Sequence, residues 1–144
     1  MGLFNANTPL SADLNLLFQI SIFIILIFGW YLKSKRRYVK HGIIMGISLV
    51  LHTISIIIVM VPSLRSMRGI FENPSSPLTL TTIAHLILGS LVEILGIWLV
   101  GKWVFNTSKI DACLKRKKIM RVVILLWLLE LLLGIYTYFM IYII

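Results

Sequence analysis

Four long apolar runs decide what this chain can fold into. Each is long enough for a helix to cross the hydrocarbon core of a bilayer, which takes about 20 residues; they are Leu14–Leu32, Gly42–Val61, Leu80–Val104 and Val122–Ile144. Membrane-spanning strands need only about 9–11 residues and alternate in polarity, which these runs do not. The sequence therefore predicts an all-α integral membrane protein with four spanning helices in a single domain, residues 1–144.

The composition excludes a water-soluble protein. Of the 144 residues, 59% are hydrophobic and 13% are charged, whereas soluble domains carry about 25% charged residues. The single cysteine, Cys113, excludes an internal disulfide and a metal site built on several cysteines. The sequence contains no nucleophile triad, phosphate-binding loop or zinc motif, so we do not expect a stand-alone enzyme.

The basic residues predict how the chain lies in the membrane. Five of the 14 Lys and Arg residues fall in Lys33–His41 and seven in Lys102–Arg121. The positive-inside bias places these two connections in the cytoplasm and both termini outside the plasma membrane. Residues 1–13 carry no Lys or Arg, so we expect the first run to be a span and not a cleaved signal peptide. The net charge of +9 then indicates topology and contact with anionic lipid, with no nucleic-acid partner.

The connections between the runs predict an antiparallel four-helix transmembrane bundle. Short connections make successive helices antiparallel neighbours. The longest connection that charge does not dominate is Pro62–Thr79. Its prolines, Pro62, Pro74 and Pro77, are expected to stop the flanking helices, and the segment is placed on the outer surface.

Five ionisable residues within or at the edge of the runs are candidates for function, because such residues are costly in a membrane and face the bundle interior. They are His41, His52, His85, Glu93 and Glu130. His41 and His52 lie eleven residues apart, within about 20° of one helix face, and His85 and Glu93 share a face of the next helix. We expect these two polar stripes to face each other.

The depths of two histidines suggest axial ligation of a b-type haem. His52 lies roughly 14 Å and His85 roughly 8–9 Å below the outer ends of their helices, so both lie in the outer half of the membrane. A haem iron needs two imidazoles on opposite faces, and a bundle core supplies an apolar slot. Arg65 and Arg68 are placed to neutralise its propionates. The alternative is a pair of core histidines that are hydrogen-bonded to other polar groups.

Two further sites remain open. His41, Met45 and Met120, with Cys113 in the same region, could form a soft copper(I) site on the cytoplasmic side, or His41 could be an ordinary interfacial histidine. Glu93 and Glu130 are each roughly 14–16 Å from the cytoplasmic side and could form a proton relay. They could equally form a neutral Glu–Glu hydrogen bond that holds two helices together.

Three stretches resemble the small four-helix membrane family that includes the CtaM oxidase-maturation factors. They are His41–Met45, with the spacing H-x-x-x-M; Ala84–Leu86, around His85; and Lys115–Tyr138, with a basic cluster followed by Trp127, Gly134 and Tyr138. The resemblance covers roughly the last two-thirds of the chain. The sequence departs from the family in having Arg116 where a third histidine occurs, in the acidic Glu130, and in the additional His52.

These features lead to three functional hypotheses. The first is a small haem-binding protein resembling cytochrome b that takes part in respiratory electron transfer. The second, which the resemblance implies, is an assembly or maturation factor for a haem–copper oxidase. The third is a structural membrane subunit without chemistry of its own. The expected partners are the lipid bilayer and either other respiratory membrane subunits or further copies of the chain.

Overall fold

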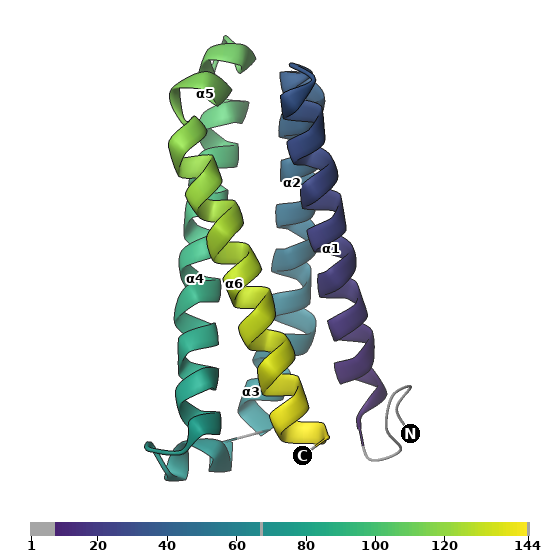
Figure 1. Cartoon of the computed structure of the whole chain (residues 1–144), viewed down its shortest axis with the longest axis vertical. Helices are drawn as coiled ribbons and strands as arrows, with labels where there is room; N and C mark the ends of the chain where they lie inside the picture. Colours follow the sequence, from purple (N-terminus) through teal and green to yellow (C-terminus); the bar gives the residue numbers. More distant parts are fainter. Residues whose placement is uncertain (1–7, 67, 144) are drawn as a thin grey trace.

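The computed structural model describes residues 8–66 and 68–143, and these residues form helices joined by short connections (Figure 1). In chain order the elements are α1 (Leu10–Ser34), α2 (Tyr38–Ser55), the π-helix η1 (Ile56–Met60), α3 (Val61–Ser66), the 3₁₀-helix η2 (Arg68–Glu72), α4 (Pro77–Val104), α5 (Lys109–Lys115) and α6 (Lys117–Tyr142). The described residues contain no strand. The prediction of an all-α fold is confirmed.

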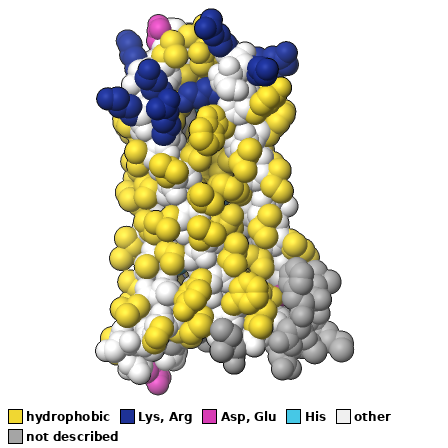
Figure 2. All heavy atoms as spheres, viewed as in Figure 1, with side chains coloured by type: hydrophobic (Ala, Val, Ile, Leu, Met, Phe, Trp, Pro, Cys, Tyr) yellow, Lys and Arg dark blue, Asp and Glu magenta, His cyan; other side chains and the backbone are white. Residues whose placement is uncertain are grey.

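Four helices are long and apolar enough to cross a membrane. They are α1, the continuous helix Tyr38–Ser66 that α2, η1 and α3 make together, α4 and α6. They lie side by side as an antiparallel bundle, as predicted (Figure 1). Apolar side chains cover most of the visible outer surface (Figure 2), and Ile58 and Leu125 are 67% and 64% exposed. Such a surface is suited to lipid and not to water.

The bundle consists of two tightly packed helix pairs. α1 packs along α2 and α4 packs along α6, whereas the contacts of α2 with α4 and of α1 with α6 are fewer. Buried apolar side chains from α1, α4 and α6 fill the space between the pairs; they are Ile22, Leu26, Val92, Leu99, Val123 and Trp127. The looser seams between the two pairs are where cavities and polar groups lie.

The expectation that Pro62 stops the second helix is wrong, because the helix continues through it to Ser66. In an α-helix the ring of Pro62 would meet the carbonyl group of Ile58, four residues before it. Residues Ile56–Met60 instead form a π-helix, whose wider turn accommodates the proline. Pro77 likewise lies inside a helix, at the start of α4, where a missing N–H is tolerated. The Ser76 side chain caps this helix by accepting a hydrogen bond from the Thr79 backbone N–H at 3.1 Å.

Charge separates the two ends of the bundle. Lys and Arg side chains gather at one end, which we call the basic end (Figure 2). The first turn of α1 and the last turn of α6 lie at the opposite end, which we call the terminal end (Figure 1). The basic connection between α4 and α6 contains the short helix α5, which the Ser108 side chain caps by accepting a hydrogen bond from the Asp111 backbone N–H at 3.3 Å.

A close contact at the basic end depends on a glycine. A Cβ atom built on Gly42 of α2 would lie 2.1 Å from Cε2 of the Trp103 ring of α4. Contacts below 3.0 Å are essentially never seen for real Cβ atoms, and a rigid indole cannot move aside cheaply. Gly42 therefore lets the indole of Trp103 pack directly against the backbone of α2.

We predict that Gly42→Ala destabilises the protein by about 1–3 kcal/mol, because the added methyl group overpacks this contact. Gly101→Ala is the matched control, since nothing lies within 4 Å of a Cβ atom built there. The control should leave stability unchanged or raise it by up to about 1 kcal/mol. Unfolding free energies in mixed micelles measure both changes, and equal values for the two variants would contradict the prediction.

Candidate functional site

His52 lies at the centre of the bundle between two carboxylates. Its side chain is fully buried, and its Nδ1 atom is 3.0 Å from Oε2 of Glu93 on α4. On the other side of the ring, Nε2 is 3.4 Å from Oε1 of Glu130 on α6. We call these three residues the Glu93–His52–Glu130 triad. The contact with Glu93 shows that the polar stripes predicted for the second and third spans meet at His52 and Glu93.

Neighbouring residues hold each carboxylate in place. The Thr53 hydroxyl donates to Oε1 of Glu93 at 2.5 Å. The Glu130 carboxylate lies against Gly89 of α4, where a Cβ atom would be 2.8 Å from Oε1. The Trp127 ring packs against the imidazole with its centroid 4.9 Å away. The triad is thus built from three of the four spans, and Gly89 leaves the room that the Glu130 side chain occupies.

One side of the triad retains unused hydrogen-bonding capacity. Among the described residues, Nε2 of His52 and Oε2 of Glu130 are fully buried and lack a well-aligned hydrogen-bond partner. Buried polar atoms in native structures are nearly always paired. A proton, a water molecule or a ligand is therefore the natural partner for this side of the ring.

A cavity connects the terminal end of the bundle with Glu130. It has a volume of about 190 Å³, and Glu130, His85 and Trp127 line its inner part. The polar side chains around the remainder are Asn15, Gln19, Ser63, Thr82, Thr137, Tyr138 and Tyr142. A water molecule occupies about 30 Å³ in the liquid and needs two to four polar partners, so this cavity suits several waters.

His85 is not a member of the triad but contacts one of its residues, Glu130. Its Nδ1 atom donates to the backbone carbonyl of Glu130 at 3.1 Å, because a carbonyl oxygen can only accept. Gly134 makes room for the ring, since a Cβ atom there would lie 3.0 Å from Cε1. His52 and His85 therefore both contact Glu130.

The predicted haem site has features for and against it. His52 and His85 each use Nδ1 for a hydrogen bond, as metal-ligating histidines usually do. However, the Glu130 carboxylate fills the space next to Gly89 beside Nε2 of His52, so a macrocycle requires this side chain to move. Arg65 is exposed at the end of α3, and the side chain of Arg68 lies outside the described residues. Axial ligation by His52 and His85 stays a prediction.

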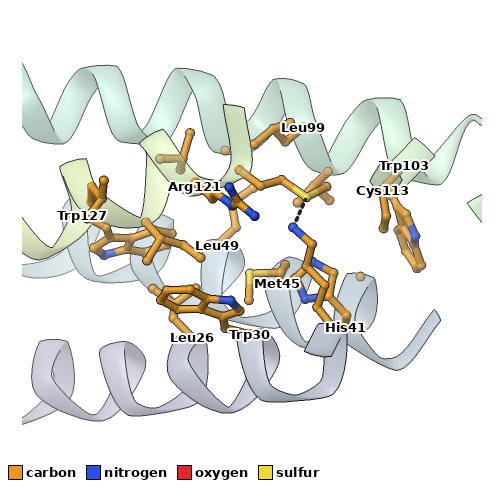
Figure 3. Close-up of a pocket in the computed structure, with 18 residues that line it drawn as sticks. Leu26, Trp30, His41, Met45, Leu49, Leu99, Trp103, Cys113, Arg121 and Trp127 are labelled. Carbon is orange, nitrogen blue, oxygen red and sulfur yellow. Dashed lines mark hydrogen bonds between the residues drawn. The ribbon is translucent and has the colours of Figure 1, made fainter. Parts of the chain in front are cut away.

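A second cavity opens at the basic end, with a volume of about 200 Å³ (Figure 3). His41, Met45, Met120 and Cys113, the residues proposed for a copper site, all line it. The Nδ1 atom of His41 donates to the Gly29 carbonyl at 2.8 Å. Burial raises the pKa of the Cys113 thiol, and nearby Lys33 offsets this only in part.

In residues 8–66 and 68–143, no three His, Cys, Asp or Glu side chains are arranged to hold a metal ion. Copper binding that uses the methionines stays a prediction.

The two glutamates are connected through His52. Both contact the same imidazole ring, so they lie at one level of the bundle, as predicted from their depth. The sequence left open whether the pair acts as a proton relay or as a Glu–Glu hydrogen bond. With the imidazole between them, the arrangement is a carboxylate–imidazole–carboxylate chain.

Sequence reasoning missed a second polar group near the terminal end. Asp13 is fully buried in the first turn of α1 and accepts a hydrogen bond from the Tyr138 hydroxyl of α6. The Ser55 hydroxyl lies 2.8 Å from Gln19 Nε2 and 2.5 Å from Asn15 Oδ1, which joins α1 to α2. Asp13 was not predicted because it precedes the first apolar run. The i, i+4 spacing of Asn15 and Gln19 was the available signal, since it places two polar side chains on one helix face.

We predict that Tyr138→Phe destabilises the bundle by about 1–3 kcal/mol, because it removes a donor from a buried carboxylate. Tyr136→Phe is the control, since Tyr136 is 47% exposed on the same helix. This change should stay within about 0.5 kcal/mol of the parent protein. The unfolding free energies of the two variants test the contact, and an unchanged value for Tyr138→Phe would exclude a stabilising role.

Comparison with known families, curated proteins and solved structures finds no match for this chain. The resemblance to the CtaM oxidase-maturation factors therefore stays a prediction.

Proposed function

We propose that this protein is a membrane-embedded proton-transfer module that serves a respiratory membrane assembly. The observation that carries the proposal is the Glu93–His52–Glu130 triad, buried midway along the bundle with a carboxylate at each ring nitrogen. Ionisable residues are costly in a membrane interior, and a group of three is far more costly than an apolar core. Chains of Asp, Glu and His residues are typical of proton pathways in membrane proteins.

The geometry supports a stepwise proton transfer. An imidazole can accept a proton at one nitrogen and release another proton from the second nitrogen. A proton on Glu130 would pass to Nε2 of His52 across 3.4 Å, after a small approach of the two groups. The proton on Nδ1 would then pass to Oε2 of Glu93 across 3.0 Å. A change of tautomer resets the ring, and no net oxidation or bond cleavage is involved.

Access to the triad is asymmetric. The terminal-end cavity reaches Glu130, whereas the walls of the basic-end cavity near His52 are Leu49, Gly96 and Trp127. The basic end would face the cytoplasm by the positive-inside bias, so protons would enter from the outer side. The Glu93 side chain is 14% exposed, whereas that of Glu130 is 4% exposed. Glu93 is therefore the group that would exchange protons with a partner subunit.

The orientation can be tested separately. An impermeant thiol reagent added from outside should fail to label cysteines placed at Lys35 and Lys117.

We predict a pH-dependent infrared band from a buried carboxyl group in the purified protein. Glu130→Gln and Glu93→Gln preserve side-chain shape but remove a titrating group, so each should remove part of the band. His52→Gln should abolish its pH dependence, because the imidazole couples the two carboxylates. Difference spectra recorded across a pH titration in H₂O and D₂O measure both effects.

Glu72→Gln is the control for this experiment, because Glu72 is an exposed carboxyl group outside the spans. It should leave the band and its pH dependence intact. A parent protein without such a band over the whole pH range in which it stays folded would identify the triad as a static structural contact. Equal effects of Glu72→Gln and Glu130→Gln would also contradict the proposal.

Haem binding is the second candidate, and the shared use of Nδ1 by His52 and His85 favours it. Bound haem would supply one-electron redox chemistry, with these two histidines holding it. Addition of haemin to the purified chain should then give a low-spin spectrum that His52→Ala and His85→Ala each abolish and His41→Ala keeps. Loss of the spectrum only in His41→Ala would move the site to the basic end. A protein that binds no haem would still be open to the proton-transfer test.

A further inference from the structure

We propose that the basic-end cavity binds an anionic phospholipid, with one acyl chain inside the bundle and the phosphate between Lys33 and Arg121. This proposal concerns a different part of the molecule from the triad and does not depend on proton transfer. It follows from the walls of the cavity, from its opening and from the charges at its mouth.

The walls of the cavity fit a hydrocarbon chain. It lies between the two helix pairs, and side chains from α1, α2, α4 and α6 surround it. Most of the lining is aliphatic or aromatic, with Trp127 at one end of the cavity and Trp103 at the other (Figure 3). Apolar cavities of this kind stay free of water and bind apolar groups.

The cavity opens sideways toward the lipid. Its lining includes Trp30 of α1 and Leu125 of α6, which are 51% and 64% exposed on the outer surface of the bundle. These two helices pack together less closely than the helices within each pair. A chain can therefore enter from the surrounding leaflet through the seam between α1 and α6, a route that a water-soluble ligand would not use.

The polar part of the lining is basic. Lys33 and Arg121 both line the cavity, and they lie within electrostatic range of each other and of Lys117. The Lys33 ammonium donates to the sulfur of Met120 at 3.7 Å, and a thioether is a weak acceptor. Among the described residues, no carboxylate lies within 4.0 Å of Lys33 or Arg121. The ion pairs in this part of the chain are those of His52 with Glu93 and with Glu130. A phosphate would be a much stronger partner for both cations.

Basic pockets between spanning helices are a recognised setting for anionic lipid headgroups. The position of the cavity at the basic end also favours a lipid headgroup, because positively charged connections lie next to the anionic leaflet of the membrane. A free phosphate would satisfy the two cations but leave the apolar slit unfilled. The occupant that uses both parts of the site is a phospholipid.

The test uses a protein in which Trp127 is the sole tryptophan, made by Trp30→Phe, Trp98→Phe and Trp103→Phe. Trp127 is 5% exposed, so a lipid chain can reach it only through a cavity. The variant is placed in nanodiscs that contain phosphatidylglycerol with brominated chains or the same fraction of brominated phosphatidylcholine. We expect the anionic lipid to quench Trp127 fluorescence several-fold more strongly.

The charge variants decide between a built site and general attraction to the surface. Lys33→Gln with Arg121→Gln should reduce quenching to the phosphatidylcholine level. Lys115→Gln with Lys118→Gln, which removes two exposed charges at the same end outside the cavity lining, should leave it unchanged. Equal quenching by the two lipids, equal effects of the two double variants, or reversal by inorganic phosphate would each overturn the proposal.

Native mass spectrometry of the parent protein provides a measurement that does not depend on the tryptophan substitutions. The parent should retain a phosphatidylglycerol molecule after detergent extraction, and Lys33→Gln with Arg121→Gln should lose it. Retention of the same lipid by this variant would also overturn the proposal.

Discussion

The contact of His52 with Glu93 and Glu130 joins three spans at one point, and the surrounding packing is arranged to allow it. Removing one partner from a buried charged group costs about 3–5 kcal/mol, whereas an intact group is far less unfavourable. The bundle satisfies this requirement with small residues and hydroxyl groups. Gly89 leaves room for the Glu130 side chain, and Thr53 fixes one oxygen of Glu93. In a membrane, where apolar burial between helices gives little driving force, such contacts help to hold the two helix pairs together.

Polar contacts and close contacts at glycine residues also join the two helix pairs to each other. Polar contacts cross between the pairs at His52 with Glu93 and at Asp13 with Tyr138. Gly42 and Gly96 let side chains of the opposite pair approach the backbone closely. Both cavities lie in the remaining space, and Trp127 lines each of them. The indole therefore separates an apolar compartment at the basic end from a more polar compartment at the terminal end.

Much of the fold could be predicted from the sequence, because the bilayer permits few alternatives. Apolar runs of about 20 residues require helices, and short connections require antiparallel neighbours. The facing polar stripes followed from the positions of His52 and Glu93 along their helices.

The partner of each polar group could not be predicted, because helical spacing gives a face but not the neighbour that the face meets. His41 illustrates this limit, since it shares a predicted stripe with His52 but bonds to Gly29 of α1. Asp13 was missed because hydropathy alone began the first span at Leu14, whereas α1 begins at Leu10.

The π-helix between α2 and α3 has a consequence for the angular position of every residue after it. A π-turn holds up to one residue more than an α-turn, and one residue corresponds to about 100° of rotation around the helix axis. The faces of the helix after Met60 are therefore rotated, relative to those before Ile56, by up to about 100° from their positions in a regular α-helix. Along one continuous helix, His52 is directed at the triad, while Ser63 and Leu64 line the terminal-end cavity. A helical wheel with a single α-helical period would therefore place Ser63 and Leu64 up to about 100° away from the angular positions that the π-turn gives them.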